Sequence, residues 1–479
     1  MAPLTEEELQ EIPEQGIDPT NPGKYATLLS DLQGNILKGH GRDHSVHLFL
    51  QFKPDQTDAL KEWIKNFAHR VTSAQKQSDE AQRYRTSKLQ GLSIKGDPFV
   101  NFLLTRKGYE SLGFEPYQIP GNEPFRYGMR NDSVKNLLRD PAVEEWEPGF
   151  QQEIHALLLI ADDNLVELLQ TVNQITRELY LLAQVVHRED GFVLRNQYQQ
   201  AIEHFGFVDG VSQPLFLKQD VITADLRDGF VNWDPRAPLS LILAQDPNGK
   251  LEDSYGSYLV YRKLEQDVPA FNSAQQFLAE NLRIDQELAG ALIMGRFRDG
   301  TPLTLSDIPA TTTNDFNYDL DVAATKCPFH AHIRKANPRG DTGHVESSGV
   351  TSEQSLQTEK NHRIARRGVN FGACDHTQAG STGSGLLFLC FQADIANQFN
   401  FIQASWSNIV NFVQVNVGPD PLIGQTVPGA ERKQKWPLEW GQPETTDEFN
   451  FELWVHLKGG EYFFAPSISF LKELTPNQE

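Results

Sequence analysis

The 479-residue chain contains little cysteine and has no excess of positive charge. Its three cysteines, Cys327, Cys374 and Cys390, cannot all pair, and none lies in a CxxC motif. A disulfide scaffold and a cysteine zinc site are therefore not supported. Lys and Arg together number 43 against 64 Asp and Glu, a net charge of −21. This balance argues against non-specific binding to nucleic acid or anionic membranes, but it leaves open a local basic pocket for an anionic ligand.

Long apolar runs are also absent. No stretch approaches the ~20 apolar residues that a membrane-spanning helix needs. The first residues, MAPLTEEELQEIPEQG, are acidic and lack the apolar core of a secretion signal. We therefore expect a soluble cytoplasmic protein with neither nucleic acid nor membrane as a partner. Hydrophobic residues make up 39% of the chain and aromatic residues 10%, which suffices for a large core.

Strand-like segments followed by helical segments occur in both halves of the chain. Apolar periodicity predicts strands at 44–52, 153–163 and 385–394, each followed by a helix, at 55–71, 164–186 and 395–406 respectively. Two further strands, 449–457 and 461–466, flank a turn at Gly459-Gly460. The pattern suggests a duplicated α+β fold, although any large α+β protein could show two such units by chance. Residues 1–27 lack periodicity and suggest an extended arm, and 338–362 suggests a long surface loop.

Two histidines, His330 and His332, are two residues apart in CPFHAHIRKANPR. On a strand this spacing would place both on one face, which suits a two-histidine metal site of a zinc or iron hydrolase. No HExxH pattern accompanies them, and the competing interpretation is a pair of polar loop histidines.

Two other segments carry candidate charged groups. In HFGFVDGVSQP, Gly206 and Gly210 would place the Asp209 carboxylate against an apolar surface, where its pKa tends to rise and it can act as acid or base. The alternative is an ordinary aspartate in a glycine-flanked turn. In IARRGVNFGA, a strand would point one of Arg366 and Arg367 inward, to stabilise an anion, and the other to solvent. The alternative is a solvated basic pair.

Taken together, these segments resemble the dye-decolourising peroxidases, a haem-dependent family. The matching motifs follow the family's order: GFVDG (206–210), the MGR–GTP element (294–302), HIRKANPR (332–339), ARRGVNFG (365–372) and GLLFLCFQ (385–392). The resemblance extends from about Leu28 to Pro466, and the chain's size and long loops resemble the group with fungal and cyanobacterial members.

The resemblance implies an α+β fold of two ferredoxin-like modules, antiparallel sheets with helices, of the dimeric α+β barrel type. The implied division is an extended arm at 1–27, an N-terminal module at 28–220 that contributes the distal aspartate, and a C-terminal module at 221–479. The second module would hold haem b, one per chain.

The resemblance also implies a role for each matching residue. His332 would be the axial ligand of the haem iron. Asp209 and Arg366 would be the distal catalytic pair, with Arg366 chosen over Arg367 by the family's pattern. Arg339 would pair with a haem propionate. Leu386 and Phe388 would line the distal pocket, although a place in ordinary strand core fits them equally well. The acidic partner of the proximal histidine stays open among Asp394, Asp420, Glu439 and Glu448.

The function that follows is a peroxidase that uses hydrogen peroxide to oxidise bulky donors, such as anthraquinone dyes and phenolics, in one-electron steps. Because bulky dyes could not reach a buried haem, electrons would pass through surface aromatics, of which no particular residue is chosen. One alternative is a haem-binding or haem-processing protein with incidental peroxidase activity, which would show negligible dye turnover per haem. Another is a haem-free stress or structural protein, which would show no Soret band.

Overall fold

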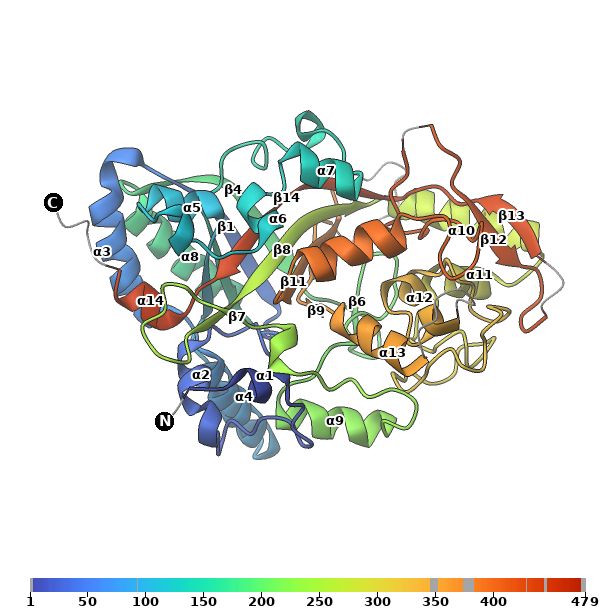
Figure 1. The fold of residues 1–479 in the computed structure, drawn as a ribbon, viewed down its shortest axis with the longest axis horizontal. Coiled ribbons are helices and arrows are strands. Elements are labelled where there is room, and N and C mark those ends of the chain that lie inside the picture. Colours follow the sequence, from blue (N-terminus) through green and yellow to red (C-terminus); the bar gives the residue numbers. More distant parts are fainter. Residues whose placement is uncertain are drawn as a thin grey trace.

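The backbone is organised around a ten-stranded antiparallel sheet that closes on itself, as seen in a computed structural model (Figure 1). The structure describes residues 3–92, 94–344, 352–373, 383–427, 429–442 and 446–474. Around the closed part of the sheet the strands follow the order β8 (Tyr255–Gln266), β14 (Val455–Ala465), β2 (Phe99–Leu104), β3 (Ala156–Asp162), β1 (His44–Phe52), β4 (Ala183–Phe192), β10 (Val369–Phe371) and β11 (Gly385–Gln392). Pairing of β11 with β8 closes the ring, and β7 (Ala244–Gln245) and β9 (Ala365–Arg366) extend it locally.

Each half of the barrel has the ferredoxin-like strand order. In the N-terminal half β1 lies between β3 and β4, with β2 outside β3; in the C-terminal half β8 lies between β11 and β14, with β10 outside β11. The two sheets join where β4 meets β10 at Phe192 and Asn370, and where β14 meets β2 at Phe464 and Leu104. The predicted α+β fold of two ferredoxin-like modules is therefore confirmed, whereas the division of the chain at residue 220 stays a prediction.

Helices surround the barrel (Figure 1). Their bounds are α1 Glu6–Gln10, α2 Ala26–Asp31, α3 Thr57–Phe67, α4 Ala74–Leu89, α5 Arg106–Ser111, α6 Glu123–Tyr127, α7 Asp132–Leu138, α8 Leu165–Leu179, α9 Lys218–Asp228, α10 Val268–Leu282, α11 Gln286–Met294, α12 His332–Ala336, α13 Ser352–Asn361 and α14 Ile468–Lys472. Two small hairpins complete the structure: β12 (Lys433–Pro437) with β13 (Thr446–Asn450), and β5 (Leu194–Arg195) with β6 (Ala201–Ile202). In the described part of the chain, no helix is both long and apolar enough to cross a membrane.

The helix predicted at 164–186 ends earlier than the apolar pattern suggested. Helix α8 begins after Asn164, whose side chain accepts hydrogen bonds from the amides of Val166 and Glu167, and it ends at Leu179. The chain then reverses and enters β4 at Ala183. The apolar run continues from the end of the helix into the start of the strand, and periodicity alone does not separate the two elements.

The hairpin predicted around Gly459-Gly460 is wrong, because β14 runs through both glycines as one strand. Its register against β8 shifts between Leu457 and Gly459, which marks a β-bulge. Gly459 has φ +143° and lies against the Phe150 ring, so close that a Cβ would lie 2.3 Å from the ring carbon Cγ. Glycine is needed here for close packing inside a strand, not for a turn.

Two segments that were expected to lack regular structure contain helices. In the segment 338–362, a short 3₁₀ helix (Asp341–His344) precedes α13, whereas residues 345–351 lie outside the described residues. In the N-terminal arm, α1 is closed by a capping box between Thr5 and Glu8. Further along the arm, Ile17 donates its amide to Phe216 and accepts that of Lys218, so the arm is tied to the start of α9.

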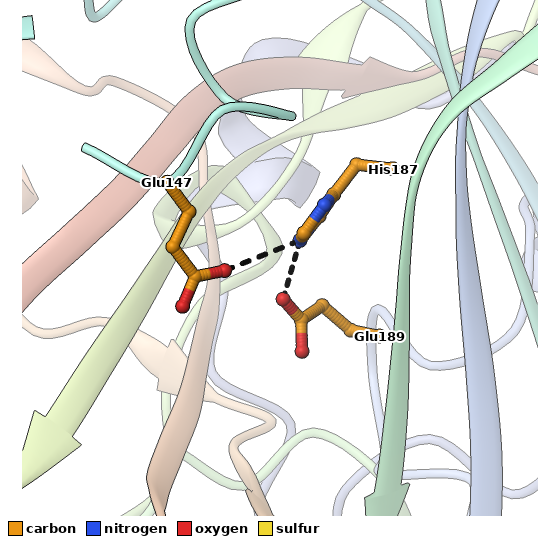
Figure 2. Close-up of side chains that lie close together, drawn as sticks. All are labelled: Glu147, His187 and Glu189. Atoms are coloured by element: carbon orange, nitrogen blue, oxygen red, sulfur yellow. Dashed lines mark hydrogen bonds and ion pairs between the residues drawn. The ribbon is translucent and has the colours of Figure 1, made fainter. Parts of the chain in front are cut away.

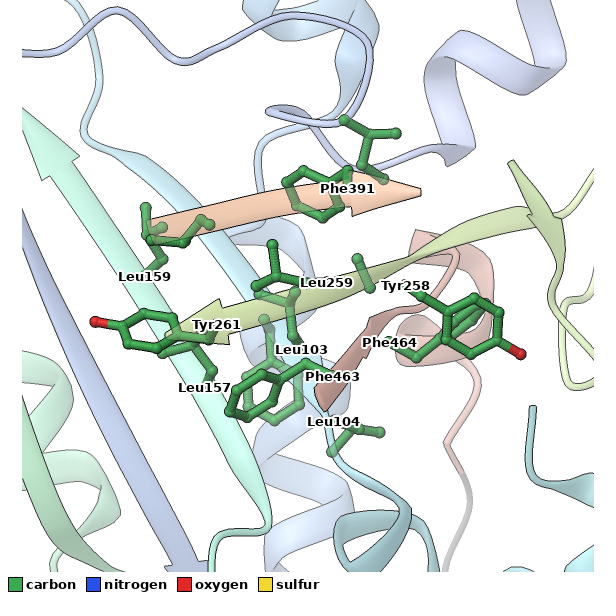
Figure 3. Packing of buried hydrophobic residues seen from close by; sticks show 14 of the residues in the cluster. Leu103, Leu104, Leu157, Leu159, Tyr258, Leu259, Tyr261, Phe391, Phe463 and Phe464 are labelled. Atoms are coloured by element: carbon green, nitrogen blue, oxygen red, sulfur yellow. The ribbon is translucent and has the colours of Figure 1, made fainter. Parts of the chain in front are cut away.

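The barrel core is filled by aliphatic and aromatic side chains from strands far apart in the sequence (Figure 3). Leu157, Leu259, Phe391 and Phe463 are at most 1% exposed. Each comes from a different strand, β3, β8, β11 and β14, so barrel closure brings them together. The burial of this apolar surface provides most of the free energy that stabilises the closed sheet.

The barrel interior also contains a cluster of charged groups, Glu147, His187 and Glu189 (Figure 2). His187 Nε2 lies 2.5 Å from Glu189 and 3.7 Å from Glu147. Their ligand atoms are close enough to surround a metal ion. However, the Lys263 ammonium already lies 2.8 Å from Glu147 and 2.7 Å from Glu189. We interpret the group as an internal ion cluster in which lysine supplies the positive charge.

Replacing Lys263 by Met should destabilise the protein by about 3–5 kcal/mol, because two largely buried carboxylates would lose their cation. Chemical denaturation of the variant measures this cost. The matched control is Lys433→Met, which removes an exposed ammonium paired with Glu431 and should change the stability by less than about 0.5 kcal/mol. Equal effects of the two substitutions would contradict the internal-cation interpretation.

Burial lowers the pKa of His47, 1% exposed, to about 3, and the charge of His40 adds to the effect. An unfolded histidine titrates near about 6.5, so below that pH the unfolded chain binds a proton that the folded chain does not. Stability should therefore fall as pH falls, by about 1.4 kcal/mol per pH unit from this residue. Denaturation at several pH values should show a shallower dependence of the unfolding free energy on pH for His47→Gln than for the wild-type protein. Parallel slopes for the two proteins would contradict the prediction.

Candidate functional site

A cavity of about 1010 Å³ lies beside the C-terminal half of the barrel. Its walls come from β8, β11, β14 and α12, together with the segments 203–214 and 422–427. All six residues singled out from the sequence line it: Asp209, His332, Arg339, Arg366, Leu386 and Phe388. The structure therefore gathers, in one place, motifs that are up to 180 residues apart in the chain.

His332 is the first residue of α12, and its Nδ1 lies 2.8 Å from Oδ2 of the fully buried Asp420. The other oxygen of Asp420 accepts the amides of Leu422 and Ile423. Burial by itself would raise the pKa of Asp420, but the charge of His332 and these hydrogen bonds outweigh it and hold the pKa below its usual value. The imidazole is thus oriented through Nδ1, which leaves Nε2 available to a ligand of the cavity. Of the four acidic residues considered as the partner of His332, Asp420 is the one that contacts it.

Of the two interpretations of the spacing of His330 and His332, the shared strand face of a metal site is wrong. The chain turns into α12 at His332, and His330 is fully buried with its ring 4.3 Å from that of Trp436. Burial lowers the pKa of His330 to about 3, with a further contribution from the Lys335 charge. His332 lines the cavity whereas His330 packs in the core, so the spacing gives no two-histidine metal site.

Helix α12 is short, and buried charges hold it in place. Arg334 is fully buried between Asp321 (2.9 Å) and Asp341 (2.6 Å), and its guanidinium lies 4.2 Å from the centre of the Tyr318 ring. Lys335 donates to the carbonyl oxygens of Trp406 and Ile409. These contacts come from residues directly after His332, so they restrict the position of the imidazole.

Asp209 and Arg366 form the second polar pair of the cavity. Arg366 Nη1 lies 3.1 Å from Asp209 Oδ1, and Nη2 donates to the carbonyl oxygen of Ser212. Gly206 and Gly210 have φ +91° and +76°, as the glycine-flanked turn requires. The side chains of Asp209 and Arg366 are about one-third exposed (31% and 35%, respectively). The Asp209 carboxylate, which was expected against an apolar surface, instead lies beside the Arg366 guanidinium. It is accessible from the cavity.

Arg367 does not point to solvent as predicted. It donates to the carbonyl oxygens of Asn35 and Ile36, 2.6 and 2.8 Å away, and so ties β9 to the N-terminal segment. Burial lowers the pKa of Arg367 to about 10, although the charge of Asp220 offsets part of the effect. The pair of arginines thus divides between the cavity and a structural role.

Leu386 and Phe388 line the cavity from β11, two residues apart on one face, as predicted. They lie opposite Leu264 and Arg262 of β8. The intervening Leu387 is fully buried on the other face of the sheet. The two side chains are therefore cavity wall, and strand alternation explains their exposure.

One edge of the cavity is lined by buried arginines stacked on aromatic rings. Arg339, 3% exposed, lies 4.0 Å from the Phe316 ring centre and 4.4 Å from that of Trp233. Arg296 packs on Phe316, and Arg363 packs on Trp233. Burial lowers the pKa of Arg339 to about 9, and the charge of Arg296 adds to the effect. Within the described residues, none of the three guanidiniums has a carboxylate at ion-pair distance, an arrangement that suits an anionic ligand.

Several residues that line the cavity were not identified from the sequence. Glu203 lies six residues before Asp209 and directly before the segment 204–214 singled out from the sequence, but its role depends on contacts across the fold. Arg296 belongs to the MGR element and could have been noticed there. Arg262 and Asp140, buried and 2.5 Å apart, lie 122 residues apart in the chain, and no local pattern connects them.

The fold and the site together define an α+β barrel protein with a large internal ligand cavity. Two family models match the chain, "DyP dimeric alpha+beta barrel domain" at residues 31–194 and "Dyp-type peroxidase, C-terminal" at residues 204–412. The chain therefore belongs to the DyP-type peroxidase family, which confirms the resemblance found in its motifs. The family implies a haem cofactor, with hydrogen peroxide and dye or aromatic compounds as the reactants.

Individual relatives cover nearly the whole chain. The crystal structure of a DyP-type peroxidase from Anabaena sp. superposes with a TM-score of 0.95 at 60% identity, over 98% of this chain and 100% of that one. The multifunctional dye peroxidase DyP2 of Amycolatopsis sp. is 39% identical over 94% of this chain and 97% of its own length. The dye-decolorizing peroxidase msp1 of Mycetinis scorodonius is 30% identical over 93% of this chain and 87% of its own length.

The residues present fit a haem. The cavity has the volume that a large cofactor needs, and a histidine with a buried aspartate behind it is available as an iron ligand. The arginine-lined edge offers buried positive charge to carboxylates. Size, ligand type and charge thus agree with the cofactor that the family implies.

Proposed function

We propose that this protein is a haem b peroxidase, with one haem per chain, that oxidises bulky dyes and phenolics by one-electron steps. The observation that carries the proposal is one cavity holding both the His332–Asp420 pair and the Asp209–Arg366 pair. The names of the relatives, which include a multifunctional dye peroxidase and dye-decolorizing peroxidases, support dyes as donors.

When bound, haem supplies an iron centre that reacts with peroxide and passes oxidising equivalents to donors. His332 would hold it through Nε2. Because Asp420 accepts a hydrogen bond from the Nδ1–H group, the imidazole gains basicity and would donate more electron density to the iron. Arg339, with the neighbouring buried arginines, would hold the propionates.

Asp209 would take the proton from one peroxide oxygen and return it to the departing oxygen, which leaves as water. Arg366, 3.1 Å from this carboxylate, would hold Asp209 in place and stabilise the negative charge that develops as the O–O bond breaks. Leu386 and Phe388 would restrict this part of the cavity to small molecules such as peroxide.

Bulky donors would then transfer electrons from outside the cavity. Among the aromatic residues of the C-terminal half, Trp406, Trp436 and Tyr462 are at most 7% exposed, whereas Trp440 is partly exposed. Trp440 also donates its indole N–H to the Leu303 carbonyl oxygen. The route that electrons follow stays a prediction.

Three substitutions separate the proposed roles. His332→Ala should lose haem or its normal Soret band, since the iron loses its protein ligand. Asp209→Asn and Arg366→Leu should keep haem but slow the reaction with peroxide by at least ~10²-fold, measured by stopped-flow absorption at the haem band. The matched controls are Asp190→Asn and Arg188→Leu, an exposed pair on β4 that should react at the wild-type rate. Wild-type rates for both cavity variants would overturn the distal assignment.

Asp420→Asn should weaken haem retention by about 10–100-fold, because the His332 imidazole loses its orienting acceptor. The rate of haem transfer to an excess of apomyoglobin measures retention independently of activity. Asp246→Asn is the matched control, since this buried carboxylate also accepts two backbone amides, those of Asn248 and Ser467, but lies outside the cavity. If the Asp420 and control variants lose haem equally fast, Asp420 does not support the iron ligand.

A further inference from the structure

A second carboxylate, Glu203, lies in the cavity wall and has no part in the roles proposed above. Its Oε2 accepts the amide of Phe205 and its Oε1 accepts the amide of Phe207, both at 2.9 Å. The carboxylate therefore closes the turn 203–207 from inside, one oxygen to each amide. Such charge-assisted hydrogen bonds are among the stronger ones in proteins.

The turn that Glu203 closes leads directly to Asp209. The Glu203 amide donates to the Phe207 carbonyl oxygen, and the Asp209 amide donates to that of Ala201, so the turn forms the end of a narrow hairpin. Val208 in turn donates its amide to Arg298. The position of Asp209 thus depends on the shape of the turn, because only Val208 separates it from Phe207.

Glu203 also connects this hairpin to the barrel. The Gln266 side chain donates to Glu203 Oε2, and Gln266 is the last residue of β8. Strand β8 pairs with β11, which carries Leu386 and Phe388. One carboxylate therefore links the segment that carries Asp209 to the strands that form the opposite part of the cavity wall.

We propose that Glu203 is the positioning residue of Asp209, holding the 203–207 turn so that the Asp209 carboxylate stays on Arg366 in the geometry that proton transfer needs. The proposal rests on the proposed function, since it gives Asp209 its role there. Burial raises the pKa of Glu203 and the charge of Asp209 adds to it, whereas the amides and Gln266 offset part of the shift. The two carboxylates are thus electrostatically coupled as well as joined through the backbone.

Glu203→Gln tests the proposal with little change in volume. The glutamine oxygen can still accept one amide, but its NH₂ group meets the other amide donor to donor, so the turn loses one of its two internal contacts. We expect the peroxide reaction of the holoenzyme to slow by at least ~10-fold, since small displacements of a catalytic group have effects of this size or larger. The rate at which the peroxide-treated enzyme then oxidises a dye should stay at the wild-type value, because that step does not use Asp209.

Glu461→Gln is the matched control. Glu461 is also a buried carboxylate that accepts two amides, those of Met129 and Tyr462, and burial likewise raises its pKa. It lies outside the cavity, so its variant should lose stability but keep the wild-type peroxide rate per haem. An equal slowing by both variants would show a general effect of destabilisation and would overturn the proposal.

A double-mutant cycle decides whether Glu203 acts through Asp209. In the Asp209→Asn background, Glu203→Gln should slow the peroxide reaction no further, because the group that Glu203 positions is already absent. Full additivity of the two effects, or an unchanged rate for Glu203→Gln alone, would overturn the positioning role. If Asp209→Asn alone reacts at the wild-type rate, the distal assignment in the proposed function fails instead, so the two failures are distinguishable.

Discussion

The cavity depends above all on the pairing of strand β8 along both of its edges. On one edge β8 pairs with β14 and on the other with β11, and without the second pairing the sheet would stay open. Because paired strands lie about 4.8 Å apart, this closure sets Leu386 and Phe388 directly opposite Leu264 and Arg262. The end of the same strand reaches the hairpin of Asp209 through Gln266. A single strand therefore connects the core of the barrel, the cavity wall and the polar pair inside it.

Around the cavity, buried carboxylates repeatedly hold loops by accepting pairs of backbone amides. Asp420 accepts the amides of Leu422 and Ile423 behind His332, Glu203 accepts two amides before Asp209, and Glu359 accepts those of Gly340 and Thr342 just after Arg339. Loops carry the functional side chains, but a loop is mobile unless its amides find acceptors. The arginine-lined edge is built differently. Arg339 is surrounded by carbonyl oxygens and aromatic rings, and it has no carboxylate partner among the described residues. Its charge is therefore left for a ligand. The net charge of −21 thus conceals a strongly positive edge inside the protein.

Much of this could be predicted from the sequence, and the errors have physical causes. The motifs at 206–210, 332–339, 365–372 and 385–392 identified six of the residues that line the cavity, because these segments match the motifs of the family in their order. Secondary-structure prediction failed where one local pattern is compatible with two structures. A strand was one interpretation of the spacing of His330 and His332, whereas α12 begins at His332. A turn was predicted at Gly459, which instead lies at a bulge packed on Phe150. The partner of His332 could not be chosen among four acidic residues, since 88 residues separate it from Asp420.

The sequence by itself determined the class of chemistry: a histidine, an aspartate and two arginines in ordered motifs, on strands and helices whose periodicity indicated a duplicated α+β fold. The family's motifs implied His332 and Arg366, but only the tertiary structure brought their side chains to one cavity and decided which carboxylates orient them. His330 and His332 have the same chemistry and nearly the same local surroundings, but one is packed against Trp436 and the other against Asp420. The physical reason is that burial and hydrogen bonding between distant segments follow from barrel closure, a property of the whole chain rather than of any segment.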